Sequence, residues 1–183
     1  QDAVAIGNGA MAAVLGLGRD KLLDCLKAAS STGIVEPANY NSPGQIVISG
    51  DKQAVEEASK LCKEAGAKKI IMLPVSAPFH CSLMAEAAMN LKTELDKIEI
   101  KDATIPVVSN VLGLPVRNAS EIRNLLIKQV TSPVLWEDSL RNMSGLGINQ
   151  FVEIGFGKVL TVLIKKTIEN ATIYNIEDTK SVK

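Results

Sequence analysis

The sequence has few residues of the kinds that build metal centres or disulfide frameworks. It contains one histidine, three cysteines and 3% aromatic residues among 183 residues. Three cysteines are an odd number, and their spacing fits neither a disulfide framework nor a zinc site. HExxH, CxxC and paired-histidine groupings are also missing. We therefore expect no bound metal, and a reducing, cytoplasmic location.

Long apolar runs and an excess of one charge are missing as well. The longest apolar stretches, such as residues 70–75, are far shorter than a membrane span. Lysine plus arginine balance aspartate plus glutamate at 20 each, without a basic run that would neutralise a row of phosphates. We expect neither a membrane nor a nucleic acid as partner. The 46% of apolar residues is enough for the core of a globular protein.

The first part of the chain alternates between strand-like and helix-like apolar patterns. Strands are predicted over residues 10–17, 34–40, 45–50 and 67–73. Two helices are predicted between them from apolar stripes at Leu22, Leu23, Leu26 and Ala29, and at Val55, Ala58, Leu61, Cys62 and Ala65. The order βαββαβ is typical of the split βαβ, or ferredoxin-like, arrangement. We predict a ferredoxin-like small subdomain over residues 8–75.

The second part has longer helices and short apolar strands. Helices are predicted over residues 80–97, 120–130, 136–146 and 158–169, and strands over residues 105–110, 151–154 and 172–176. This alternation predicts a parallel sheet and an α/β fold. Three strands are few for a parallel sheet buried on both faces. We therefore predict that residues 76–183 are part of a larger sheet whose other strands are not in this sequence.

His80 is the single candidate for a histidine base. It is predicted to lie after a strand and before a helix, and ligands of open α/β sheets bind at the carboxyl ends of strands. The competing interpretation is a histidine that caps a helix or is satisfied in a core. Cys81 follows directly, but neighbours on a helix point in different directions, so we interpret it as a packing residue.

Two further motifs bear on catalysis. Gly155, Phe156, Gly157 and Lys158 follow a predicted strand and open a helix, but they match neither the P-loop nor the dinucleotide-binding pattern. A glycine turn is the favoured interpretation. The sequence also lacks a GxSxG nucleophile elbow. A catalytic triad of that type cannot be completed within this chain.

Six segments in consistent order resemble the malonyl-CoA:acyl carrier protein transacylases of type II fatty acid synthesis, and the related acyltransferase domains of polyketide synthases. They include an NxNSPxQ-like turn at residues 39–45 and a histidine segment at residues 73–84; the others are residues 9–17, 106–111, 129–136 and 153–160. The resemblance implies an α/β-hydrolase-like large subdomain, of which residues 76–183 are the C-terminal part, with a ferredoxin-like subdomain inserted.

The resemblance also implies ping-pong acyl transfer through an acyl-serine. His80 is then the general base, and Gln129 matches the residue whose main-chain carbonyl orients the histidine in place of a carboxylate. The expected partners are malonyl-CoA and acyl carrier protein, with the coenzyme A thioester as substrate and no cofactor.

Several residues match positions that the family uses around its substrate. Phe79 resembles the aromatic residue associated with malonyl rather than methylmalonyl selectivity, a discrimination usually worth about 1–3 kcal/mol. Lys68 and Lys69 fall where basic residues meet coenzyme A or carrier-protein phosphates, although an ordinary solvated strand end explains them equally well. The remaining polar matches, which turn chemistry would also explain, are Asn39, Asn41, Gln45 and Asn110.

The family's oxyanion-hole glutamine, nucleophilic serine and malonyl-binding arginine have no counterpart in this sequence. We therefore expect this chain to be the C-terminal part of such an enzyme, inactive alone and partnered by the missing N-terminal part. Alternatives are a non-catalytic module that binds carrier protein, and an acyltransferase for another acyl group. An exposed apolar face on the second sheet would favour the hypothesis that this chain is part of a larger enzyme, and a fully covered sheet would favour the binding module.

Overall fold

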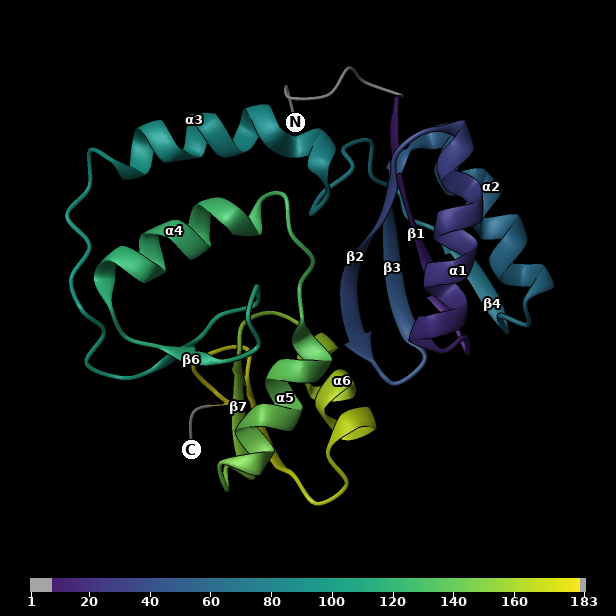
Figure 1. The fold of residues 1–183 in the computed structure, drawn as a ribbon. Coiled ribbons are helices and arrows are strands. Elements are labelled where there is room, and N and C mark those ends of the chain that lie inside the picture. The colour runs from purple at the N-terminus through teal and green to yellow at the C-terminus, as the bar shows by residue number, and fades with distance from the viewer. Residues whose placement is uncertain (1–7, 182–183) are drawn as a thin grey trace.

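A four-stranded antiparallel sheet forms the first lobe of the computed structural model, which describes residues 8–181 (Figure 1). Its order is β2-β3-β1-β4. The strands are β1 (Gly9–Leu15), β2 (Val35–Ser42), β3 (Gln45–Asp51) and β4 (Lys69–Met72). Every neighbouring pair is antiparallel, and β3 lies between β1 and β2. The sequence order and pairing agree with the split βαβ arrangement expected for this part of the chain.

Two helices cover one face of this sheet, α1 (Arg19–Ala29) and α2 (Lys52–Glu64) (Figure 1). A short 3-10 helix, η1 (Ser30–Thr32), follows α1. The apolar stripes predicted for both helices face the core, because their residues recur at the spacing of helical turns. Leu23 is the exception, since it remains 43% exposed. The turn between β2 and β3 consists of Pro43 and Gly44 alone, which is shorter than the turn expected over residues 39–45. Gly44 takes the positive φ of 68° that such a tight turn needs.

In residues 82–181, the second lobe contains four α-helices of 9 to 11 residues, which are no longer than α1 and α2, and two separate strand pairs. The elements are η2 (Ser82–Met84), α3 (Ala85–Leu95), β5 (Val107–Val108), β6 (Pro115–Val116), α4 (Ala119–Gln129), α5 (Trp136–Gly145), β7 (Gln150–Ile154), α6 (Val159–Thr167) and β8 (Thr172–Ile176). The predicted helices are confirmed to within a few residues. Residues 182 and 183, the last two of the predicted large-subdomain range 76–183, lie outside the described residues.

The prediction that three strands form one parallel sheet is wrong for the strand over residues 105–110. β7 and β8 pair in parallel, as expected. However, the strand predicted over residues 105–110 shrinks to β5, which pairs antiparallel with β6. A turn at Gly113, with φ of 68°, brings these two strands together, and the amide of Ser109 donates to the carbonyl of Leu114 at 3.0 Å. A local hairpin partner therefore replaces the more distant parallel one.

The two lobes meet along the edge strand β2. The amide of Val134 donates to the carbonyl of Ala38 at 2.8 Å, and the amide of Tyr40 donates to the carbonyl of Val134 at 2.9 Å. Residues just before α5 thus add to the edge of the first sheet. Next to this contact, Arg19 of α1 binds the carboxylate of Asp138 in α5 at 2.9 Å. The join combines backbone pairing with an ion pair.

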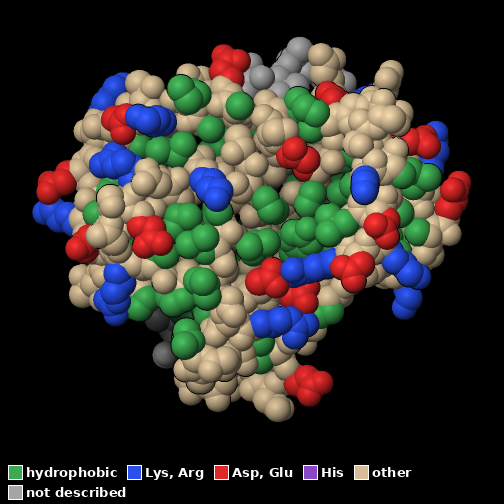
Figure 2. Space-filling view, viewed as in Figure 1, with side chains coloured by type: hydrophobic (Ala, Val, Ile, Leu, Met, Phe, Trp, Pro, Cys, Tyr) green, Lys and Arg blue, Asp and Glu red, His purple; other side chains and the backbone are tan. Residues whose placement is uncertain are grey.

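The second strand pair leaves apolar side chains open to solvent. Val152 and Ile154 on β7 are 53% and 79% exposed, and Tyr174 on β8 is 55% exposed. Green hydrophobic patches also extend across the middle of the face shown in Figure 2. Such an exposed apolar area is typical of a surface that another element covers.

Within residues 8–181, no helix is both long and apolar enough to cross a membrane.

Candidate active site around His80

His80 lies in an unusual backbone conformation between the two lobes. Its φ is 61°, and among the described residues it is the only non-glycine residue with positive φ. Such a conformation costs about 1–3 kcal/mol and persists only where the surroundings impose it. The helix predicted from residue 80 begins later, with η2 at Ser82 and α3 at Ala85. His80 therefore belongs to the connection that precedes the helix.

The imidazole ring of His80 contacts the end of α4. Its Nδ1 lies 3.0 Å from the main-chain oxygen of Gln129. A carbonyl oxygen only accepts hydrogen bonds, so we assign the proton to Nδ1. Nε2 then keeps its lone pair. This is the arrangement that a histidine base requires, with a fixed tautomer and a free basic nitrogen.

Gln129 offers its carbonyl because α4 ends there. The helix starts at the cap residue Asn118, whose side chain accepts the amides of Ser120 and Glu121. The last carbonyls of a helix lack partners within the helix. The side chain of Gln129 donates to the carbonyl of Ser132 at 2.8 Å, which fixes the chain just beyond the helix. The structure thus places the predicted pair, His80 and Gln129, in contact.

Cys81 is a packing residue, as the sequence predicted. It is fully buried, and its Sγ donates to the carbonyl of Pro78 at 3.1 Å. Burial raises the pKa of the Cys81 thiol, because the thiolate would lose its hydration. The thiol is therefore kept protonated and unsuited to act as a nucleophile.

Glu36 and Ser82 form a contact that the sequence analysis missed. The carboxylate of Glu36, on β2, accepts the main-chain amide and the hydroxyl of Ser82, both at 2.8 Å. The two residues are 46 positions apart. Ser82 belongs to the histidine segment of residues 73–84, whereas Glu36 lies in none of the six segments. Only the folded arrangement reveals that they flank His80.

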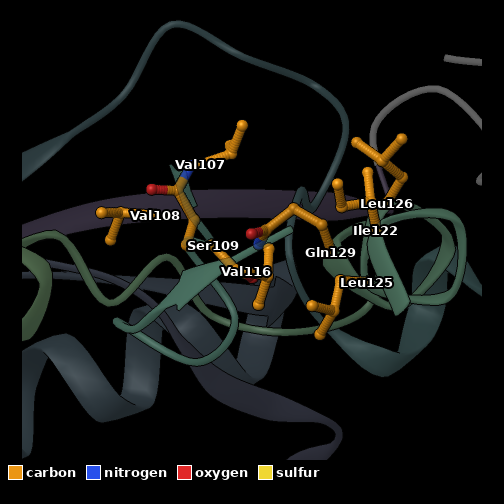
Figure 3. A pocket seen from close by; sticks show the side chains of 9 residues that line it. Val107, Val108, Ser109, Val116, Ile122, Leu125, Leu126 and Gln129 are labelled. Atoms are coloured by element: carbon orange, nitrogen blue, oxygen red, sulfur yellow. The ribbon is translucent and has the colours of Figure 1, made fainter. Parts of the chain in front are cut away.

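Asn39 and Asn110 join the same region through their backbones. Asn39 forms a parallel bridge with Val134, and the carbonyl of Asn110 accepts the amide of Leu135 at 2.7 Å. Asn110 and Gln129 also line one apolar cavity of about 170 Å³. Figure 3 shows the Gln129 side chain between the leucines of α4 and the valines of β5 and β6. These predicted site residues therefore gather around residues 129–135.

The remaining predicted residues lie at two separate places, one next to His80 and one at the far end of the first sheet. Phe79 precedes His80 and is 36% exposed. Lys69 and Gln45 both pair with Leu15, at the end of β1 opposite Gly9, and Lys68 and Asn41 lie at that same end. Gly9 packs against Pro78, near His80. A seven-residue strand is about 20 Å long, so the structure does not bring the two lysines to the histidine.

The glycine turn before α6 does not offer an anion site. The carboxylate of Glu153 accepts the amides of Leu160 and Thr161 at 2.9 and 2.8 Å. Hydrogen bonding by Thr161 and by the Leu160 amide lowers the pKa of Glu153. The amides that a phosphate would need are already used. In the described residues, no group of three or more potential metal-ligating side chains converges.

Comparisons with known proteins show what this chain is similar to. The model of the acyl transferase domain family matches residues 2–182. The malonyl CoA-acyl carrier protein transacylase of Escherichia coli K12 is 45% identical over 172 residues, which are 94% of this chain and 56% of that protein. A crystal structure of an acyl carrier protein S-malonyltransferase from Vibrio cholerae superposes with a TM-score of 0.97 at 42% identity, covering 100% of this chain and 60% of that one.

A third relative is a malonyl-transacylase in complex with its type II PKS acyl-carrier protein. It gives a TM-score of 0.95 at 41% identity, over 99% of this chain and 59% of that one. The chain thus spans a little more than half the length of the relatives it matches. With a family model that matches nearly every residue, an α/β fold shared with solved relatives and a histidine held by a main-chain carbonyl, this chain belongs to the acyl transferase domain family.

Proposed function

We propose that this chain supplies the general base of a malonyl-CoA:acyl carrier protein transacylase. The observation that carries the proposal is the 3.0 Å contact between Nδ1 of His80 and the Gln129 carbonyl. The names of the relatives support malonyl as the acyl group and acyl carrier protein as the acceptor. The nucleophilic serine is supplied by a part of the enzyme that is not in this sequence.

In the first half-reaction, Nε2 of His80 removes the serine proton while the serine oxygen attacks the thioester carbonyl of malonyl-CoA. The tetrahedral intermediate collapses by breaking its C–S bond, and the imidazolium returns the proton to the departing coenzyme A thiolate. In the second half-reaction, His80 removes the proton of the phosphopantetheine thiol, which takes the malonyl group. The serine leaves with that proton. No cofactor takes part, because every proton cycles through one imidazole.

The main-chain carbonyl of Gln129 orients the His80 ring without placing a negative charge beside it. A carboxylate in the same place would add a negative charge beside the ring and stabilise the imidazolium strongly. The carbonyl of Gln129 fixes the tautomer through its dipole alone. His80 can then both take and return a proton within one turnover.

The open second sheet supports an incomplete enzyme over an independent binding module. Val152 and Ile154 of β7 are more than half exposed, although strands in a two-sided α/β sheet are covered on both faces. We propose that β7 and β8 belong to a larger, α/β-hydrolase-like parallel sheet. The missing part of the enzyme then covers them and adds the serine, the oxyanion donors and the cation for the malonyl carboxylate.

Intact-mass spectrometry after incubation with malonyl-CoA tests this function. We expect no malonyl adduct on this chain alone, because it lacks the nucleophile. When the serine-bearing N-terminal part is supplied, an adduct should form on that part and pass to holo acyl carrier protein. The adduct should be lost with His80→Ala.

The matched control is Lys27→Ala, which removes an exposed charge in the last turn of α1 and should leave adduct formation in place. A malonyl adduct on this chain alone would contradict the proposal, as would equal labelling of the serine-bearing part with wild-type and His80→Ala chains.

A further inference from the structure

The backbone of His80 is held on three sides. Towards the N-terminus, the buried Pro78 packs on Gly9 and accepts the thiol of Cys81. At the ring, Nδ1 meets the carbonyl of Gln129. Towards the C-terminus, the contact is the pair of hydrogen bonds from Ser82 to Glu36. Each side involves a different element of the fold, so the positive φ is imposed by tertiary structure.

On the C-terminal side, Glu36 is itself held in place by the first lobe. Its backbone pairs with Ser49 in the centre strand β3, and the preceding Val35 is buried in the core of the first lobe. A carboxylate that accepts two donors from one residue holds that residue in both position and orientation. Ser82 is two residues from His80, so its placement restricts the two peptide units that set the direction of the ring.

We propose that Glu36 is a positioning residue for His80, an inference that rests on the proposed function of His80 as base. Glu36 acts on the backbone: it anchors Ser82 to β2 and thereby keeps His80 at positive φ, with its ring against Gln129. Without this anchor, the backbone of His80 relaxes towards the ordinary regions of φ and ψ, and the ring leaves the carbonyl. The tautomer is then no longer fixed.

The competing explanation is that Glu36 only caps the short helix η2. Capping stabilises the helix start without any effect on a ring two residues earlier. The two explanations differ in one observable, the tautomer of His80. Because this chain contains a single histidine, its ring nitrogens give one assignable set of signals in long-range ¹H–¹⁵N NMR spectra.

The experiment compares the full chain and its variants at one mildly alkaline pH. The wild-type ring should show the Nδ1–H tautomer. Glu36→Ala should lose most of that population and show averaged signals of both tautomers. Ser82→Ala removes one of the two hydrogen bonds and should give a smaller change. Adding Ser82→Ala to Glu36→Ala should change nothing further.

Glu64→Ala is the matched control, because Glu64 is an exposed glutamate at the end of α2 and its side chain makes no hydrogen bond to another residue of the described range 8–181. It should keep the wild-type tautomer. Thermal unfolding of each variant separates a local change from loss of the fold, and Ser82→Ala retains a test if Glu36→Ala does not fold.

An Nδ1–H population equal to that of wild type in folded Glu36→Ala, or in Ser82→Ala where Glu36→Ala does not fold, would overturn the positioning role and leave the proposed function intact. A wild-type ring without that tautomer would overturn the His80–Gln129 arrangement on which both proposals depend. Failure of malonyl transfer with the expected tautomers would count against the proposed function alone.

Discussion

At the scale of single residues, burial decides which nucleophilic groups are available. The three cysteines are free and buried in the described structure. Cys62 is fully buried on α2, and burial, together with the neighbouring thiol of Cys25, raises the pKa of Cys62 to about 12. Its thiol therefore stays protonated where an exposed thiol ionises. Cys62 and Cys81 therefore offer no reactive thiolate near neutral pH.

This raised pKa predicts that stability falls with increasing pH. Between about pH 9 and 12 the folded Cys62 keeps its proton while the unfolded one loses it, so the unfolded state binds fewer protons. The full effect is on the order of 4 kcal/mol over that range. Urea unfolding under reducing conditions at several pH values measures it. Cys62→Ala should be less stable overall but should show a shallower decline, and equal slopes would contradict the assignment.

How far the sequence predicts the site also depends on single residues. His80 could be identified because it is the only histidine, and Gln129 because of family resemblance. Glu36 could not be identified, because a glutamate in a strand has no sequence signal for a serine that lies 46 positions away. Local patterns report burial and periodicity, whereas this contact depends on where the connection after β4 crosses the sheet.

At the scale of elements, the helices follow from the sequence and the short strands do not. Apolar residues at helical spacing predicted α1 and α2 well, since each helix packs one stripe on the sheet. Residues 105–110 are as apolar as a buried strand, yet only Val107 and Val108 pair. An apolar composition predicts that a segment is buried, but it does not predict which strand the segment pairs with. The turn at Gly113 determines that β5 pairs with β6.

Helix α6 provides a test of capping by a distant carboxylate. Glu153 accepts two amides of the first turn of α6, so Glu153→Gln should weaken the start of that helix. Because the folded pKa is lowered, the contribution of Glu153 is present above its unfolded pKa and is lost as pH falls through the folded one. The difference in unfolding free energy between wild type and Glu153→Gln should therefore shrink from pH 7 towards acid.

The control for this prediction is Glu169→Gln, a substitution at an exposed glutamate just beyond α6. Its effect should be small at every pH. A difference for Glu153→Gln that stays constant across the acid range would show that the carboxylate does not cap α6.

At the scale of the whole molecule, a few polar contacts join the two lobes. Arg19 binds both oxygens of Asp138 at 2.9 and 3.0 Å, and its guanidinium lies 4.3 Å from the centre of the Tyr40 ring. Glu137 adds a longer contact at 3.5 Å. The groups are partly exposed, so solvent screens them and the pair contributes about 1 kcal/mol or less. Their effect is on how the lobes are joined, more than on how each lobe folds.

Removing this cluster should loosen the joint selectively. In Arg19→Ala, the amides of Tyr40 and Val134, which bond across the lobes, should exchange with solvent faster. Amides that pair β1 with β3 should keep their protection. Hydrogen exchange followed by NMR measures both sets, and Arg19→Lys should give an intermediate result because it keeps the charge without the planar fork. Uniform loss of protection in both sets would contradict a local joint.

The contact between Gly9 and Pro78 has a consequence for how the molecule is assembled. A Cβ added at Gly9 would overlap the Pro78 ring, so the first strand of the small lobe begins where the chain leaves that lobe. The whole βαββαβ unit therefore enters and exits at a single point. A unit with adjacent ends can be spliced into a host chain, or exchanged for another, without stretching the host. The small lobe therefore has the geometry of an insertable unit, and His80 follows two residues after the proline at which its two ends meet.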